Sequence, residues 1–347
     1  MVSPPVEAEI DRLAQGYVSK RKNVALAIGG IQQGHSFFKG FGKISPSNPI
    51  PPNSQTIYEI GSITKVFTGL VLSSLVNDGT VALDDSIQLH LPPDVARSLP
   101  VGVQAITLRH LATHTSGLPR LSNGFFSDRV DLANPYKNYT TSELYADLAT
   151  IELLSPPGQK YEYSNLGMGL LGHLLSLKAA RPYEDLVKQR LCETMWMSDT
   201  TILLTQSQQQ RLVPGHSLDG NLTSNWDFDV TAPAGAFRST VADLLTFLQA
   251  NLNQTETPVT AMFQRSHQPS FKVNDSLSLG LAWHIFTLPT NNVYWHNGGT
   301  GGYKSFLAFD EATQAGVVIL SNYGDAMVND ESLDEMAIAI LSLLAET

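Results

Sequence analysis

Three short motifs carry residue types that together could perform acyl transfer. They are Ser-Ile-Thr-Lys at residues 62–65, Tyr-Ser-Asn at residues 163–165 and His-Asn-Gly-Gly at residues 296–299. A serine hydroxyl is a weak nucleophile that needs a neighbouring group to take its proton, and lysine or tyrosine can do so. A glycine-rich strand lets backbone N–H groups approach the oxyanion that then forms. The motifs therefore predict a site that forms a covalent acyl-enzyme.

Ser-x-x-Lys occurs three times, so its setting must decide which copy does chemistry. Residues 19–22 end an amphipathic helix, which indicates a solvated basic patch, and residues 36–39 alternate like a strand, which sends the serine and the lysine to opposite faces. Residues 62–65 follow a short apolar strand, predicted at 57–60, and open a helix predicted to run to about residue 76. Positions i and i+3 share a helix face, so Lys65 can reach Ser62. The alternative is that Ser62 only caps the helix.

The Tyr-Ser-Asn motif lies between a Ser-Pro-Pro-Gly loop and an apolar helix predicted at 166–177. Tyr163 and Asn165 can project into a cleft from such a junction. Ser164 or Asn165 can also simply cap the helix, and both interpretations can hold together. The second Tyr-x-Asn, at residues 136–138, has no such setting, and we interpret it as a surface turn.

The glycine cluster at residues 298–302 lies between two strand-like runs, 292–295 and 303–309. Gly298 and Gly299 permit close backbone approach to a ligand, whereas the alternative is a flexible hairpin turn. His296, directly before the cluster, favours chemistry. Tyr303, directly after it, is predicted to contact substrate.

These motifs and their flanking segments, at residues 58–65, 108–119, 156–165, 232–240 and 296–303, resemble the family of class C β-lactamases and penicillin-recognising serine hydrolases. That family includes D-alanyl-D-alanine carboxypeptidases, D-aminopeptidases and esterases, and the resemblance covers nearly the whole chain. It implies a serine hydrolase that acts on β-lactam or D-amino-acid peptide amide bonds and needs no cofactor or metal. A carboxylesterase, or a penicillin-binding sensor that deacylates slowly, remains the alternative.

The resemblance also implies a role for each residue. Ser62 would be the acylated nucleophile, and Lys65 and Tyr163 would share its proton and later activate the deacylating water. Asn165 would orient either the substrate amide or Lys65. The backbone N–H groups of Ser62 and Gly299 would form the oxyanion hole, beside Gly298.

One residue departs from the β-lactamase pattern. Class C β-lactamases usually have lysine where this chain has His296, and a lysine supplies a permanent charge that anchors a substrate carboxylate. A histidine is mostly neutral at pH 7, so the position resembles the esterase, peptidase and aminopeptidase branches. We hypothesise that His296 either polarises the site when protonated or accepts a hydrogen bond from Tyr163 as a neutral ring.

The composition of the chain argues against a nucleic-acid partner, and the remaining motifs argue against metal and dinucleotide sites. The 347 residues are 42% hydrophobic, enough for a large core, and 22 basic against 32 acidic residues give a net charge of −10, so nucleic acid is not an expected partner. A small molecule is the expected substrate, and the oligomeric state is left open. The lone Cys192 is predicted to be a buried packing residue. His110 and His114 lack a metal-site pattern, and the glycines at 167, 169 and 172 match a dinucleotide fingerprint only in letters, because they lie inside an apolar helix.

Neither a membrane span nor a signal peptide is expected. The apolar stretch at residues 336–345 is too short to cross a bilayer, and residues 1–5 lack an apolar core. The family resemblance nevertheless implies a periplasmic or secreted protein.

The pattern of elements predicts an α+β fold. Strands are expected near residues 24–28, 36–41, 57–60, 279–287, 293–296, 304–309 and 316–320, and neither chain end has enough of them for a sheet alone. Both ends must therefore meet in one antiparallel sheet, flanked by helices at residues 6–19 and 336–345. A third helix is expected after Thr240, with Asp243 completing a capping box. We predict a sheet domain from residues 1–82 and 236–347, a mostly helical domain from 83–235, and an active site at their junction.

Overall fold

The computed structural model describes residues 2–126, 130–253, 255, 257–326, 328 and 330–346. The strands in these ranges are β1 (Ala25–Gln32), β2 (His35–Gly42), β3 (Ile57–Glu59), β4 (Arg238–Thr240), β5 (Phe271–Lys272), β6 (Leu277–Leu279), β7 (His284–Thr287), β8 (Asn292–Gly299), β9 (Lys304–Asp310) and β10 (Ala315–Ser321). The α-helices are α1 (Pro4–Val18), α2 (Thr64–Asn77), α3 (Pro93–Ser98), α4 (Val101–Gln104), α5 (Leu108–Ala112), α6 (Thr141–Leu148), α7 (Asn165–Ala179), α8 (Tyr183–Val187), α9 (Gln206–Gln209), α10 (Val241–Leu252), α11 (Pro258–His267) and α12 (Ser332–Ala345). Short helical turns complete the set: η1 (Gly61–Ile63), η2 (Ile87–Leu89), η3 (Asn123–Phe126), η4 (Lys188–Cys192) and η5 (Ala232–Ala234).

Eight strands form one antiparallel sheet in the order β2-β1-β10-β9-β8-β7-β6-β5. The first and last strands of the chain pair next to the β2 edge of the sheet, where Ile28 lies opposite Ile319. All seven residues of β10 are buried, as expected for a Val/Ile-rich strand with helices over both faces. A separate two-stranded ribbon joins β3 to β4.

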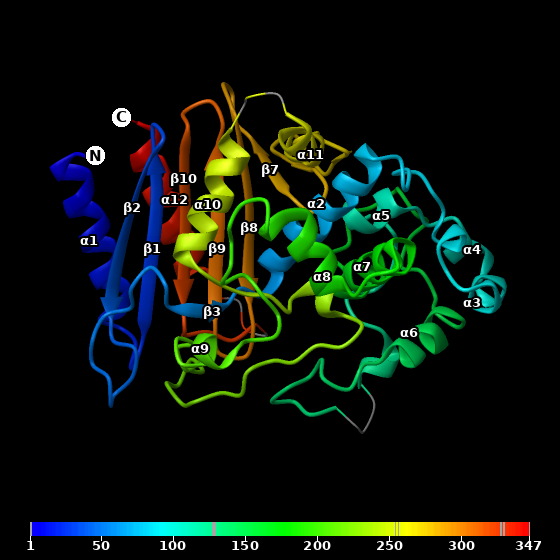
Figure 1. Cartoon of the computed structure of the whole chain (residues 1–347), viewed down its shortest axis with the longest axis horizontal. Coiled ribbons are helices and arrows are strands. Elements are labelled where there is room, and N and C mark those ends of the chain that lie inside the picture. Colours follow the sequence, from blue (N-terminus) through cyan, green and yellow to red (C-terminus); the bar gives the residue numbers. More distant parts are fainter. Residues whose placement is uncertain are drawn as a thin grey trace.

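Helices cover both faces of the sheet (Figure 1). On one face α12 packs on β1, β9 and β10, with α1 beside it, and a hydrophobic cluster fills the space between. On the other face α10 packs on the same three strands. The mostly helical region from α3 to α8 extends away from the strands, and the two chain ends lie near each other at the sheet side of the molecule (Figure 1).

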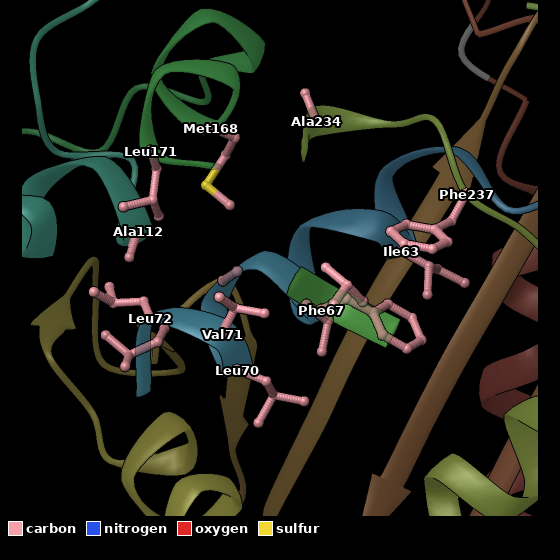
Figure 2. Close-up of a cluster of buried hydrophobic side chains, with 14 of the residues drawn as sticks. Ile63, Phe67, Leu70, Val71, Leu72, Ala112, Met168, Leu171, Ala234 and Phe237 are labelled. Atoms are coloured by element: carbon pink, nitrogen blue, oxygen red, sulfur yellow. The ribbon is translucent and has the colours of Figure 1, made fainter. Parts of the chain in front are cut away.

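Helix α2 is the centre of the second, larger core. Eleven of its residues are buried, because apolar side chains surround it on nearly every side. Figure 2 shows Phe67 of α2 beside Phe237, while Ala112 of α5 and Met168 and Leu171 of α7 belong to the same cluster. The rings of Phe67 and Phe237 stack with their centroids 5.7 Å apart. This packing fixes α2, and with it the turn that carries Ser62.

The α+β fold, with an antiparallel sheet built from both chain ends between helices, is confirmed. The domain limits at residues 82/83 and 235/236 stay a prediction. Within the described ranges, no helix combines the length and the apolar character needed to span a bilayer.

Two expectations about elements were wrong. Residues 279–287 do not form one strand, because the chain bends between β6 and β7 at Ala282, whose φ is +63°. Asp243 does not complete a capping box with Thr240. Its carboxylate instead accepts hydrogen bonds from the backbone N–H of Asp199 and the hydroxyl of Thr200, so it ties α10 to a distant loop.

Two packing expectations are confirmed. Cys192 is buried, with 3% of its surface exposed. The glycines of α7 serve close packing, since a Cβ at Gly172 would lie 2.2 Å from Pro233 Cγ and one at Gly169 would lie 3.0 Å from Thr231 Cα.

Candidate active site

Ser62 lies where its own turn and the end of β8 approach so closely that Gly61 and Gly298 have no room for a side chain. It belongs to the turn η1, ahead of α2, and it is not the residue that caps α2. A Cβ at Gly61, whose φ is +49°, would lie 2.6 Å from the Gly299 nitrogen, and one at Gly298 would lie 2.9 Å from the Ser62 nitrogen. The end of β8, with the Gly299 nitrogen, therefore runs directly against the turn that carries Ser62.

Lys65 lies beside Ser62, as the i, i+3 spacing predicts. Its Nζ lies 2.8 Å from Ser62 Oγ and donates to the Ala234 carbonyl at 2.5 Å. The side chain is fully buried. Burial, and then the charge of Arg120, hold the pKa of Lys65 well below its usual range. No carboxylate among the described residues forms an ion pair with it, so nothing offsets the burial that favours the neutral amine.

Tyr163 contacts Ser62 from the other side. The Ser62 side chain is close enough to the Tyr163 hydroxyl to oppose part of the rise in the Tyr163 pKa, and the tyrosine ring lies 4.9 Å from Lys65 Nζ. The ring packs against His114 with centroids 4.4 Å apart, and the next backbone N–H, of Ser164, donates to His114 Nδ1 at 3.1 Å. Burial raises the pKa of Tyr163 above its usual value. The group is therefore a phenol that can give a proton.

Asn165 lies in the site, but it does not bond Lys65. Its Nδ2 donates to the Tyr136 hydroxyl at 2.8 Å, and its Oδ1 is buried with no partner in the described part of the chain. Oδ1 is thus an acceptor that a substrate N–H could satisfy. Residues 136–138 form the expected turn, with Lys137 and Asn138 exposed, but only 6% of Tyr136 is exposed and it lines the pocket.

His296 is a neutral ring in this structure. Its Nδ1 lies 2.6 Å from the Asn297 carbonyl, and a carbonyl can only accept, so Nδ1 carries the hydrogen. Its Nε2 is buried without a partner within the described ranges. Burial, and then the neighbouring His284 and Lys65, hold the pKa of His296 well below its usual range. Of the two hypotheses for His296, this favours the neutral acceptor, with its ring centroid 6.4 Å from that of Tyr163.

Tyr303 does not reach the site. It is 1% exposed, and its hydroxyl donates to the Val213 carbonyl at 2.6 Å. Its ring packs against Gly215, where a Cβ would lie 2.7 Å from it. The predicted substrate contact is therefore wrong, because the side chain leaves the turn on the side away from Ser62.

Two adjoining parts of a pocket meet at Ser62. The first, of about 350 Å³, has an aromatic wall in which Tyr136 stacks on Phe228 and lies near Trp226. The second, of about 550 Å³, is more polar. Its lining includes Tyr161, Tyr163, His284, Asn297 and Lys304, and both parts share Ser62, Arg120, Gly299 and Ala326.

Sequence reasoning missed several of these residues. Arg120 had a signal, because it directly follows the segment 108–119 on which the family resemblance depends. Tyr161 lies two residues before Tyr163, and its hydroxyl lies 3.0 Å from His284 Nε2. No signal in the sequence pointed to His284, since only the pairing of β7 with β8 places it beside His296, with ring centroids 5.1 Å apart.

Comparison with known proteins gives the family of the chain. The family model described as Beta-lactamase matches residues 10–341, and the chain therefore belongs to the β-lactamase family. Among solved structures, a class C β-lactamase superposes with a TM-score of 0.86 at 21% identity, covering 97% of this chain and 96% of its own. A β-lactamase/D-alanine carboxypeptidase from Pseudomonas syringae gives 0.83 at 21% identity, covering 97% and 99%.

Two curated relatives are similar over most of the chain. The D-alanyl-D-alanine-carboxypeptidase/endopeptidase AmpH of Escherichia coli strain K12 is 28% identical over 328 residues, which is 90% of this chain and 82% of AmpH. Protein flp of Staphylococcus aureus strain N315 is 25% identical over 327 residues, which is 93% of this chain and 64% of that protein.

Proposed function

We propose that the protein is a serine hydrolase that cleaves amide bonds of D-amino-acid peptides or β-lactams through an acyl-enzyme on Ser62. The observation that carries the proposal is the 2.8 Å contact between Ser62 Oγ and the Nζ of a fully buried Lys65. Membership of the β-lactamase family, and the similarity to a D-alanyl-D-alanine carboxypeptidase, support this class of substrate.

The geometry supports a division of work between the proton carriers. Lys65, as a neutral amine, takes the hydroxyl proton while Ser62 Oγ attacks the carbonyl carbon. The N–H groups of Ser62 and Gly299 stabilise the oxyanion. Tyr163, as a phenol, donates its proton to the leaving nitrogen and regains one from Lys65 as the C–N bond breaks. Water then attacks the acyl ester by the reverse sequence, which releases the acid and restores Ser62.

Two other residues support binding rather than proton transfer. The unpartnered Oδ1 of Asn165 can accept the N–H of a substrate amide. The Nε2 of His296 can accept a hydrogen bond from Tyr163, which would orient the phenol toward the leaving group. Gly298 keeps β8 close enough to Ser62 for the oxyanion contact.

A carboxylesterase of the same family is the second candidate. The neutral His296 favours it, because no fixed charge at that position holds a substrate carboxylate. A penicillin-binding sensor uses the same acylation and differs only in the rate of deacylation.

The test incubates the protein with a chromogenic cephalosporin, a D-alanyl-D-alanine peptide and a short-chain nitrophenyl ester, and records turnover and intact mass. We expect turnover of the cephalosporin or the peptide that is lost in Ser62→Ala. Ester turnover alone would move the assignment to the esterase, and a stable mass gain without turnover to the sensor. Activity that survives in Ser62→Ala would contradict the nucleophile.

We further infer a periplasmic or secreted location from the family resemblance. Fractionation of the source cells followed by immunodetection tests it, and a purely cytoplasmic signal would refute it.

A further inference from the structure

Arg120 is the exposed cation at the centre of the pocket. It follows Pro119 in the segment between α5 and η3, and it lines both parts of the pocket. Its guanidinium carbon lies 5.2 Å from the ring centroid of Tyr163. Its carbonyl accepts the N–H groups of Asn165 and Leu166 at 3.0 and 3.2 Å, so the start of α7 fixes its backbone. The side chain thus projects from a rigid position beside the nucleophile.

The guanidinium has no anionic partner in the part of the chain that the structure describes. The only side-chain contact recorded for it is with the face of Tyr163. Most other arginines of the chain are paired; Arg109, for example, binds Asp84 through two hydrogen bonds of 2.8 and 3.0 Å. Five donors in a planar fork at the pocket surface suit a carboxylate, which accepts two parallel hydrogen bonds.

The two histidines on the opposite wall of the pocket cannot supply that charge. His296 is neutral, and burial lowers the pKa of His284 to about 4, so both rings on β7 and β8 are uncharged at pH 7. Lys304 also lines this part, but it is half-buried, and its Nζ points to the Val328 carbonyl at 3.5 Å. None of the described residues that line either part is an aspartate or a glutamate. A substrate ammonium would therefore find no counter-charge.

We propose that Arg120 binds a carboxylate of the substrate next to the scissile bond, so that the protein selects carboxypeptidase-type substrates over neutral esters and over substrates with a free amine there. This inference rests on the proposed acyl-transfer function. Because Arg120 lies over Tyr163, which donates to the leaving group, the carboxylate it binds belongs to the leaving group. The permanent charge thus comes from the loop before α7 and not from the strand that carries His296.

The experiment compares two substrates with the same scissile ester: the depsipeptide N-acetyl-D-alanyl-D-lactate, which has a free carboxylate, and its carboxamide. We expect the wild-type protein to prefer the carboxylate. In Arg120→Gln the ratio of the two kcat/KM values should fall about 10- to 100-fold, the range for a lost charge-assisted pair. Arg120→Lys should keep part of the preference, since it keeps the charge but not the fork. Arg181→Gln is the matched control, because Arg181 is exposed and lines neither part of the pocket, and it should change the ratio less than about twofold. Lys304→Gln removes the other cation that lines the pocket and should lower the ratio less than Arg120→Gln does.

Each contrary outcome has a definite meaning. An equal loss for both substrates in Arg120→Gln would overturn the inference, because Arg120 would then act only on the electrostatics of Lys65 and Tyr163. An unchanged ratio, a similar fall in Arg181→Gln, or a larger fall in Lys304→Gln than in Arg120→Gln would overturn it as well. If the wild-type protein hydrolyses both substrates equally, the carboxylate site is refuted, but the proposed acyl-transfer function is not. If the wild-type protein hydrolyses neither substrate and its intact mass shows no bound acyl group, the proposed function is refuted as well.

Discussion

Burial shifts the pKa values of Lys65 and Tyr163 in opposite directions, and both shifts favour the uncharged side chain. A buried amine loses hydration when charged, and so does a buried phenolate, so burial lowers the pKa of Lys65 and raises that of Tyr163. Burial therefore favours a neutral amine beside a neutral phenol over an ion pair of the two. This arrangement favours Lys65 as the base during acylation, and the two groups titrate as a coupled unit.

The first residue-scale prediction concerns Lys65→Met, which keeps the volume of the side chain and removes the amine. We expect turnover to fall about 10²- to 10⁴-fold, the contribution of general base catalysis. Stability should respond to pH with a definite sign. The folded protein has a lowered Lys65 pKa, so below the unfolded value of about 10.4 the unfolded chain binds a proton that the folded protein does not. Wild-type stability thus decreases as pH falls, and the variant lacks this loss.

Urea unfolding of both proteins at pH 9 and at pH 6.5 measures the effect. The unfolding free energy of the variant relative to wild type should rise toward the lower pH. Lys272→Met, an exposed lysine on β5, serves as the control and should show no such trend. A difference between Lys65→Met and wild type that is constant with pH would contradict the buried neutral amine.

The contact of Ser62 with Lys65 could be predicted because both residues lie in one local element, where spacing alone sets the neighbour. Arg120, Tyr136 and His284 could not, because loops and strand pairing bring them to the site from three distant segments. Tyr303 shows that nearness in the sequence can also mislead. It lies next to the glycine cluster in sequence, yet its ring packs away from Ser62 into Gly215.

At the scale of elements, the site depends on the contact between the end of β8 and the turn η1. A Cβ at Gly298 would lie 2.1 Å from the Ile60 carbonyl oxygen and 2.5 Å from Ser305 Oγ. Backbone atoms cannot yield by that much locally, so β8 must move away from Ser62. The Gly299 N–H, the second proposed oxyanion donor, would move with it.

We therefore predict that Gly298→Ala lowers kcat by about 10²- to 10³-fold, the usual cost of losing one oxyanion donor. Steady-state kinetics with the ester substrate measures the loss, and circular dichroism shows whether the fold persists. Gly316→Ala on β10 is the matched control, because its Cβ would meet nothing closer than 3.5 Å. Equal kcat values for the two variants would show that the close approach has no part in catalysis.

The elements themselves were largely predictable where hydrophobic patterns were long, as in α2, α7, β9 and β10. The failures came from tertiary structure. The bend at Ala282 interrupts an apolar run that otherwise reads as one strand, and the carboxylate of Asp243 bonds a loop more than forty residues away in place of its own helix.

For the whole molecule, the sequence required strands from both ends to meet, but it did not specify their order. The pairing of β1 with β10 is fixed by which strands are buried on both faces, a property of the assembled fold. A second long-range junction joins the ribbon of β3 and β4 to the aromatic wall of the pocket. Its centre is Glu59, which is 3% exposed.

Glu59 Oε1 accepts hydrogen bonds from Arg238 Nη2 at 3.1 Å, Asn225 Nδ2 at 2.9 Å and the backbone N–H of Trp226 at 3.1 Å. Arg238 also donates to the carbonyls of Trp226 and Ile202. One carboxylate thus joins three segments and holds the loop that places Trp226 in the pocket. Its removal leaves the buried Arg238 with only the exposed carboxylate of Asp227, 4.0 Å away, among the described residues.

We predict that Glu59→Ala lowers the free energy of unfolding by about 3–5 kcal/mol, as expected when one member of a buried ion pair is removed. Glu9→Ala, which breaks an exposed pair with Arg12 on α1, should have a much smaller effect, because solvent screens an exposed pair. Urea unfolding of both variants gives the comparison. Because Glu59 also anchors the loop of Trp226, the KM for substrates with a bulky acyl group should rise in Glu59→Ala under conditions where that variant is folded. Equal stabilities of the two variants would mean that the Glu59 junction adds nothing to the assembly of the fold.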